Sequence, residues 1–251
     1  MVAAGLDEGK GQYLRHRLYL AVFILPVLFR APSVRAQPLD RAPDTMAARV
    51  LACTPCHGTQ GQGTGNATFP RLAGKPAGYL FNQLVAFRGG RRQYPPMNYL
   101  TGFMPDAYLH AIADYFAAQR PPFPPTTIPI VSKDFLALGQ ALVTHGDPGR
   151  GIPACLGCHG AMVTGMEPAI PGLLGLQPSY ISAQLGGWRY GTRTAAAPDC
   201  MQLVAGRLTE TDVTAVAAWL STLPGPADPT PAAQGSLAMP LACGSEPGGG
   251  G

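Results

Sequence analysis

The sequence predicts an all-α protein made of two tandem copies of one small helical domain. The segment FPRLAGKPAGYLFNQLVAFRGGRR (residues 69–92) aligns with IPGLLGLQPSYISAQLGGWRYGTR (residues 170–193), and matched positions stay 101 or 102 residues apart. Apolar residues recur at helical spacing in both copies, and no alternation typical of strands is found. A proline-rich segment, RPPFPPTTIP, separates the two copies.

The helices are expected in the same order in each copy. The last helix of the first copy shows the i, i+3, i+4 spacing of a buried stripe, and Thr209 with Asp212 resembles a capping box at the start of its counterpart. A less regular segment carrying a methionine precedes this last helix in both copies. The expected helices cover residues 45–52, 76–87 and 105–119, then 134–144, 178–188 and 209–223.

The proline-rich segment at 121–129 is the expected linker, because it is stiff and cannot continue a helix. It separates a first domain at 37–120 from a second at 130–224, and a tail rich in Pro, Ala and Gly covers 225–251. Each copy has fewer than about 100 residues, which is small for a self-sufficient apolar core. A further group is therefore expected to fill the centre of each copy.

Residues 1–36 are typical of an export signal. Arg15, His16 and Arg17 precede the apolar run LYLAVFILPVLF, which is too short to span a bilayer but suits a signal peptide. The small residues of SVRAQ predict cleavage after Ala36, and an uncleaved signal that anchors the chain is the alternative. A periplasmic, oxidising location follows from this interpretation.

The charge balance argues against binding to nucleic acid. The whole chain has 18 Lys and Arg against 14 Asp and Glu. The first 36 residues hold five of these cations and two of these anions, so the rest has 13 against 12 and a net charge of +1. This leaves no basic surface of the kind that phosphate backbones require.

Two motifs, CTPCHG (residues 53–58) and CLGCHG (residues 155–160), place two cysteines and a histidine in one helical turn. Such a turn can attach one haem through both thiols and offer the histidine to its iron. A zinc site would need a second ligand pair nearby, and a thioredoxin-like motif would need a βαβ context. The motifs therefore predict two haem c groups, held by Cys53 and Cys56 and by Cys155 and Cys158, with His57 and His159 as iron ligands.

The sixth ligand of each iron is expected to be a methionine. Met97 and Met201 lie 44 and 46 residues after the first cysteine of their motifs, and each lies seven residues before an apolar position that precedes the last helix. Met104 occupies that apolar position in the first copy, and Met166 has no counterpart, so both are more typical of core residues. Met97 and Met201 would close both sites, which favours electron transfer over catalysis.

The other two histidines after the signal, His110 and His145, are not repeated between the copies. A surface or capping role suits them better than iron ligation. Their scarcity argues against a di-haem peroxidase and against a cytochrome with two histidine ligands per iron.

Taken together, the chain from about residue 44 to 223 resembles the di-haem cytochrome c4 family, two cytochrome c-like domains in tandem, each built around a covalently bound haem. The resemblance is carried by CTPCHG, by the repeated segment from Phe69 and by the segment around Met97. It implies that the carbonyls of Pro70 and Pro171 orient the ligand histidines. It also suggests a group of haem neighbours, namely Tyr79, Tyr180, Arg88 and Arg189.

The resemblance implies a periplasmic electron carrier, not an enzyme. Its donor would be a quinol-oxidising complex or a dehydrogenase, and its acceptor would be a terminal oxidase. Contact with a membrane would come only through such partners or through an uncleaved signal. The alternative function is the haem-bearing subunit of a periplasmic dehydrogenase acting on thiosulfate, an alcohol or sulfite.

Two cysteines, Cys200 and Cys243, lie outside the haem motifs. In an exported chain, two remaining thiols favour a disulfide, which would tie the apolar tail segment SLAMPLACG to the segment carrying Met201. Free thiols, an intermolecular bridge and iron ligation by Cys200 are the alternatives.

Overall fold

The structure, a computed structural model, describes residues 44–126 and 129–246, and these belong to one compact unit. The expected signal peptide and its cleavage after Ala36 lie outside the described residues. Helices dominate the described part of the chain, so the all-α prediction is confirmed. Strand structure there is limited to β1 (Gly165–Met166) and β2 (Ile170–Pro171), which form a two-residue antiparallel ladder.

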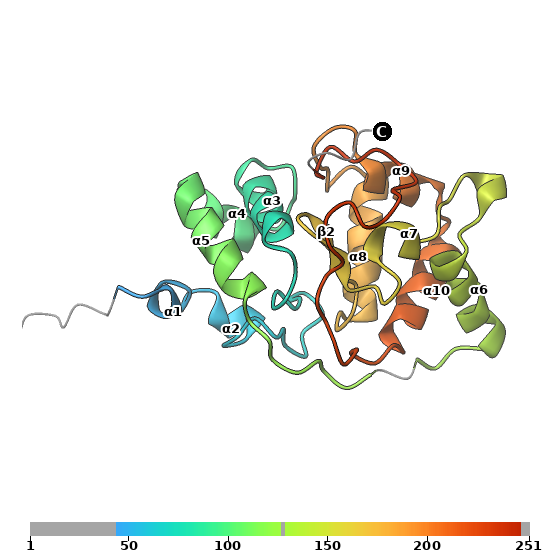
Figure 1. Cartoon of the computed structure of the whole chain (residues 1–251), viewed down its shortest axis with the longest axis horizontal. Coiled ribbons are helices and arrows are strands. Elements are labelled where there is room, and N and C mark those ends of the chain that lie inside the picture. The colour runs from blue at the N-terminus through green and yellow to red at the C-terminus, as the bar shows by residue number, and fades with distance from the viewer. Residues whose placement is uncertain (1–43, 127–128, 247–251) are drawn as a thin grey trace, which may run out of the picture. The chain divides into compact units, whose positions relative to one another are not determined.

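The first copy is organised around two helices of equal length, α3 (Ala77–Arg88) and α5 (Asp106–Ala117), which pack on each other (Figure 1). Leu109 and Phe116 of α5 are almost fully buried, so the apolar stripe predicted for this helix faces the core. The remaining helices are short: α1 (Met46–Arg49), α2 (Thr54–His57) and α4 (Pro95–Thr101).

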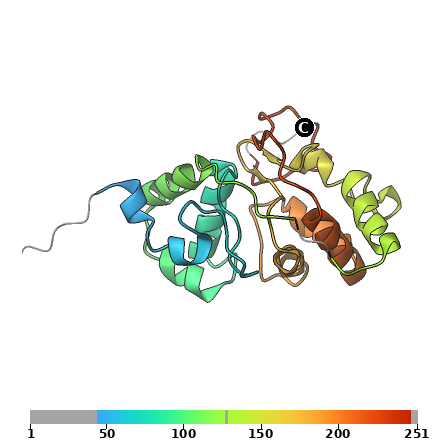
Figure 2. The same cartoon turned by 90° about the horizontal axis from the view of Figure 1, so that it is seen from below.

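The second copy repeats this plan. Its core lies between α6 (Lys133–Thr144), α8 (Pro178–Arg189) and α10 (Glu210–Ser221), and Figure 2 shows α6 and α10 side by side. The predicted capping box is present at the start of α10. The shorter elements are the 3₁₀ turn Pro148–Arg150, α7 (Leu156–His159) and α9 (Cys200–Arg207).

Two local expectations were wrong. The methionine segments are helical, because Pro95 and Pro96 occupy the first turn of α4, where proline is favoured, and Asp199 caps α9 by accepting a hydrogen bond from the Gln202 amide. The first helix of the chain is shorter than the predicted 45–52, because α1 ends at Arg49 and irregular turns lead into α2.

The segments predicted as linker and tail contact the folded core. Arg71 donates hydrogen bonds to the carbonyls of Pro121 and Pro122. In the tail, the Ala232 amide donates to the Gly165 carbonyl, so the tail extends the small ladder by one bridge. Within residues 44–126 and 129–246, no helix is long and apolar enough to cross a membrane.

Candidate functional site

The two cysteine motifs adopt the same backbone geometry. Each forms a single helical turn, α2 or α7, that begins after its first cysteine and ends at its histidine. The glycine that follows, Gly58 or Gly160, has φ of +84° in both copies. Glycine adopts this left-handed conformation without strain, so the chain can leave the turn abruptly after the histidine.

Both histidines are buried and oriented by a backbone carbonyl from a neighbouring loop. The Nδ1 of His57 lies 3.0 Å from the Pro70 carbonyl oxygen, and the Nδ1 of His159 lies 2.7 Å from the Pro171 carbonyl oxygen. A carbonyl can only accept, so Nδ1 carries the proton and Nε2 keeps its lone pair. The Pro70 and Pro171 contacts are those that the family resemblance implies.

The protonation state of these histidines suits metal binding. Burial lowers the pKa of His57 and of His159, although the carbonyl hydrogen bonds oppose this shift. Nearby cations, Arg92 for His57 and Lys75 for His159, lower the pKa further. Both rings are therefore held neutral with Nε2 available, which is the form that ligates a metal.

Three of the motif thiols, those of Cys53, Cys155 and Cys158, do not have the electrostatics of a redox centre. Burial raises the pKa of the Cys155 thiol to about 12, and it also raises the pKa of Cys53 and Cys158. Reactive cysteines in redox CxxC motifs show the opposite shift, toward the thiolate. The arrangement is consistent with thiols that are consumed in covalent attachment.

The methionines differ in their surroundings. Met97 and Met201 are half-buried, and Met201 packs against the core of the second copy from the first turn of α9. Met104 packs against the core of the first copy. Met166, in β1, is 1% exposed. Met104 and Met166 thus lie where core residues are expected.

Of the remaining residues singled out from the sequence, the two tyrosines lie at the interface of the two copies, and the arginines and histidines lie elsewhere. Tyr79 and Tyr180 take part in a buried hydrogen-bond cluster described below. Arg88 instead donates to the Met104 carbonyl and pairs with Asp106, and Arg189 lies over the ring of Tyr190. His110 stacks on Phe81 and His145 contacts the Thr144 hydroxyl, both at exposed positions.

A reciprocal cluster joins the two copies. Arg92 donates to Gln83 of its own copy and to Gln184 and Tyr180 of the other, over distances of 2.7–3.0 Å. Arg193 mirrors it, donating to Gln184 at 2.8 Å, to Gln83 at 2.8 Å and to Tyr79 at 3.4 Å. The two arginines also form an antiparallel backbone bridge. Because residues 83, 92, 184 and 193 are related by the repeat, the interface has an approximate twofold character.

The arginines of this cluster were not singled out from the sequence, although both end the repeated segments. Each guanidinium lies over the aromatic ring at the matched helix position, Arg92 over Phe87 at 4.5 Å and Arg193 over Trp188 at 3.7 Å. An identical arginine five residues after an aromatic residue in both repeats was the available signal.

This cluster fits a group that brings negative charge. Arg92 and Arg193 are buried, and none of the ion pairs seen in residues 44–126 and 129–246 includes either of them. Burial alone would raise the pKa of the Tyr79 hydroxyl. The neighbouring cations Arg193, Arg92 and Lys75 outweigh burial and lower this pKa to about 8. The buried Trp188 Nε1 has no hydrogen-bond partner in the part of the chain that the structure describes. Carboxylates of a haem would meet both needs.

Cys200 and Cys243 are joined by a disulfide across 43 positions of the sequence, with their Cα atoms 5.1 Å apart. Cys200 begins α9 directly before Met201. The Gly244 amide also donates to the Pro198 carbonyl. The tail is therefore fixed to the segment that carries Met201.

Comparisons with known proteins agree with this geometry. No protein-family model matches the chain. A thiosulfate dehydrogenase electron acceptor of Thiomonas intermedia (strain K12) is 35% identical over 215 residues, which are 85% of this chain and 94% of that protein. A cytochrome c4 of Pseudomonas aeruginosa is 33% identical over 178 residues, 70% of this chain and 86% of that protein.

Solved structures give the same result. The reduced recombinant cytochrome c4 from Pseudomonas stutzeri matches with a TM-score of 0.62 and 28% identity, covering 70% of this chain and 96% of that one. A thiosulfate dehydrogenase from Marichromatium purpuratum matches with a TM-score of 0.64 and 33% identity, covering 71% of this chain and 40% of that one. The chain is thus an electron carrier with two haem c groups, and it belongs to the di-haem cytochrome c4 family.

Proposed function

We propose that this chain accepts electrons from a periplasmic dehydrogenase and delivers them to a terminal oxidase. The donor favoured by the comparisons is a thiosulfate dehydrogenase, because two relatives at 35% identity are named as electron acceptors of that enzyme. A structural neighbour is itself a thiosulfate dehydrogenase. The substrate chemistry would take place on the partner, and this chain would receive single electrons.

In this proposal the two motif turns hold the haems. Cys53 and Cys56 attach the first and Cys155 and Cys158 the second, with His57 and Met97 as iron ligands in the first copy. His159 and Met201 take the same positions in the second copy. Haem bound in this way supplies one-electron exchange at its iron. The chain's own contribution is to fix each imidazole: the Pro70 and Pro171 carbonyls hold the proton on Nδ1 and direct Nε2 to the metal.

The interface cluster would hold the two sites in a fixed relation. Arg92 and Arg193 each bind side chains of both copies, so neither guanidinium can move without breaking hydrogen bonds on both sides. Their charge would stabilise haem carboxylates at the junction between the copies. Tyr79 and Tyr180, which were expected near the haems, lie in this cluster, whereas Arg88 and Arg189 would remain peripheral.

The proposal includes the expected organisation of the chain. Residues 1–36 would be removed after Ala36 on export, leaving domains at 37–120 and 130–224 joined by a linker at 121–129. The tail at 225–251 would be fixed to the second domain through Cys200 and Cys243. The disulfide seen in the structure supports an oxidising compartment.

The single observation that carries the electron-transfer role is the matched pair of histidine sites joined by the reciprocal arginine cluster. The donor is tested by stopped-flow mixing of the ferric protein with purified thiosulfate dehydrogenase and thiosulfate, followed at the haem α-band. We expect both haems to be reduced at a rate that saturates with enzyme concentration. Thiosulfate without enzyme is the control.

The second candidate donor, a quinol-oxidising complex, is tested in the same apparatus with quinol in place of thiosulfate. Faster reduction by this complex than by the dehydrogenase would contradict the proposed donor while leaving the carrier role intact. Failure of both donors to reduce the protein would contradict the carrier role as stated.

A further inference from the structure

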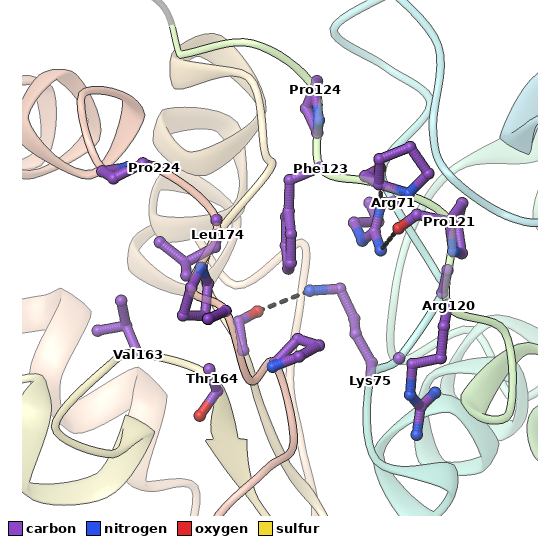
Figure 3. Close-up of a pocket in the computed structure, with 18 of the residues that line it drawn as sticks. Arg71, Lys75, Arg120, Pro121, Phe123, Pro124, Val163, Thr164, Leu174 and Pro224 are labelled. Atoms are coloured by element: carbon purple, nitrogen blue, oxygen red, sulfur yellow. Dashed lines mark hydrogen bonds between the residues drawn. The ribbon is translucent and has the colours of Figure 1, made fainter.

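A cavity of about 780 Å³ lies where the two copies meet the linker and the tail. The first copy contributes Arg71 and Lys75, and the second contributes Thr164, Gly172 and Leu174 (Figure 3). Arg120 with linker residues 121–126, and Pro224 with tail residues between 225 and 229, complete the wall. Arg71 and Gly172 directly follow the prolines whose carbonyls orient His57 and His159, so the cavity borders both histidine loops.

Arg71 is a buried cation of this cavity with neutral partners. It is 4% exposed, and its guanidinium donates to the Pro121 and Pro122 carbonyls at 2.7 and 2.9 Å. Its carbon Cζ lies 4.2 Å from the centre of the Phe123 ring. These contacts fix the guanidinium in place without neutralising its charge.

Lys75 is the second buried cation. It is 8% exposed, and its Nζ donates to the Gly172 carbonyl oxygen at 2.6 Å, a bond drawn as a dashed line from Lys75 in Figure 3. An ammonium has three donors, and among residues 44–126 and 129–246 the Gly172 carbonyl is the one hydrogen-bond acceptor of Nζ. Burial, reinforced by Arg71 and Arg193 and opposed by Tyr79, lowers the pKa of Lys75 to about 8. The ammonium form still predominates at neutral pH, with donors to spare.

The cavity contains no compensating acid. Its wall includes Arg71, Lys75 and the exposed Arg120, but no aspartate or glutamate among the described residues that line it. Glu167 interacts electrostatically with Arg120 without lining the cavity. Buried cations without a counter-charge are costly, so a bound anion would stabilise this arrangement.

The positive charge is specific to the first copy. By the repeat, Arg71 corresponds to Gly172 and Lys75 corresponds to Leu176. The carbonyl of Gly172 is the acceptor for the Lys75 Nζ, and a Cβ atom at Gly172 would overlap the backbone of Thr164. The basic pair is therefore not a general requirement of the domain's fold, since the second copy folds without it.

We propose that this cavity is a binding site for a small inorganic dianion of the sulfate type, held by Lys75 and Arg71. This goes beyond the electron-carrier function and does not depend on which dehydrogenase is the donor. A dianion there would lie beside both histidine loops and would stabilise the ferric over the ferrous state, so the protein would become easier to oxidise when the anion is bound.

The test is calorimetric titration of sodium sulfate into the full-length ferric holo-protein at pH 6.5, with ionic strength kept constant by sodium chloride. We expect saturable one-to-one binding. Lys75→Met should weaken it at least about tenfold, because a charge-assisted hydrogen bond is lost. The substitution removes a buried charge and keeps the chain length, so the fold should be retained.

Lys133→Met is the matched control, because Lys133 is exposed at the start of α6 and does not line the cavity. It should bind sulfate like the parent protein. A second measurement is the midpoint potential, which sulfate should lower in the parent protein and in Lys133→Met but not in Lys75→Met.

Three results would overturn the proposal. One is equal affinity of Lys75→Met and Lys133→Met for sulfate. Another is the absence of saturable binding, which would mean that haem carboxylates already neutralise the cavity. The third is binding of acetate as tight as that of sulfate, which would assign the site to carboxylates instead of inorganic dianions.

Discussion

At the scale of single residues, the central feature is that two proline carbonyls orient the imidazoles of two buried histidines. Pro70 and Pro171 cannot donate a backbone hydrogen bond, but their carbonyls are free to accept, and each faces the Nδ1 of a buried histidine. The same pairing in both copies fixes the tautomer of both rings. The spacing of the cysteines and histidines in the chain is itself a chemical requirement and therefore predicts their positions, whereas the roles of Pro70 and Pro171 were implied only by the family resemblance.

The residue-scale prediction concerns the second iron site. Met201→His should keep the haem attached, because attachment uses Cys155 and Cys158, but it should lower the midpoint potential of the second haem, since a thioether ligand raises the potential relative to imidazole. A potentiometric titration measures the midpoint potential, and the visible spectrum should show loss of the far-red methionine–iron band of one haem.

Met166→Leu is the control for that experiment. Met166 is buried in β1 and packs as a core residue, and leucine conserves its volume closely. The far-red band and both potentials should be unchanged. An unaltered band and potential in Met201→His, or their loss in Met166→Leu, would show that the iron ligand had been assigned to the wrong methionine.

At the scale of elements, the long helices could be predicted from their apolar periodicity, whereas α4 and α9 could not. The apolar periodicity of α3, α5, α8 and α10 places their ends within a few residues of the prediction. The one-turn helices and α4 and α9 carry too few residues to show a period, and their helicity depends on local prolines and caps. The repeat marks Arg92 and Arg193 in the sequence, but their hydrogen-bond partners depend on tertiary structure and could not be predicted from it.

The packing of α6 on α10 gives the first element-scale prediction. A Cβ atom added at Gly139 would overlap the backbone carbonyl of Ala215 and press on the Trp219 side chain. Gly139→Ala should therefore lower the free energy of unfolding by about 1–3 kcal/mol, although alanine is the better helix former. Gly206→Ala in α9 is the control, because a Cβ there meets nothing within 4 Å, and it should stabilise by about 0.4–1 kcal/mol. Denaturant unfolding that ranks the two variants in the opposite order would contradict the close packing.

The N-terminus of α10 gives the second element-scale prediction, which concerns the pH dependence of stability. Burial would raise the pKa of Asp212, but Arg150 and the hydrogen bonds at Thr209 outweigh it and leave the pKa below its ordinary value of 3.8. A carboxyl whose pKa is lower in the folded state stabilises the fold above the unfolded pKa, and this contribution is lost as the pH falls through the folded pKa.

Stability measured by thermal unfolding should therefore fall below about pH 4 more steeply in the parent protein than in Asp212→Asn. Arg150→Gln, which keeps the carboxyl but removes its charged partner at 2.7 Å, should give an intermediate slope. Identical pH profiles for all three proteins would show that Asp212 titrates as in the unfolded chain.

At the scale of the whole molecule, the interface between the two copies is nearly symmetric, but the cavity and the tail are not. The arginine cluster contacts both copies alike, whereas the cavity takes its buried cations from the first copy, and the disulfide joins the tail to the second. Pro240 also lies within contact distance of the site where a side chain on Gly157, inside the second cysteine motif, would begin. The two copies could be recognised from the sequence but the arginine contacts between them could not, and the asymmetric part lies in positions where the copies differ and in the unrepeated tail.

The disulfide therefore gives the last prediction, which concerns how the tail and the second haem site are coupled. Cys200 starts the helix that carries Met201, so removing its partner should loosen both the tail and the methionine segment. By chain entropy, a bridge across 43 positions contributes up to about 4 kcal/mol, so Cys243→Ser should lower the stability of the second copy by no more than this. The far-red band of the second haem should weaken while that of the first is unchanged.

Adding reductant to the parent protein should reproduce the behaviour of the Cys243→Ser variant, because thioether bonds to haem resist reduction. Cys200→Ser combined with Cys243→Ser should lower the stability no more than either change alone. Release of a Cys243 peptide as a free thiol from a non-reduced digest of the parent protein would contradict the bridge itself, and an unchanged second band in Cys243→Ser would contradict its link to the iron site.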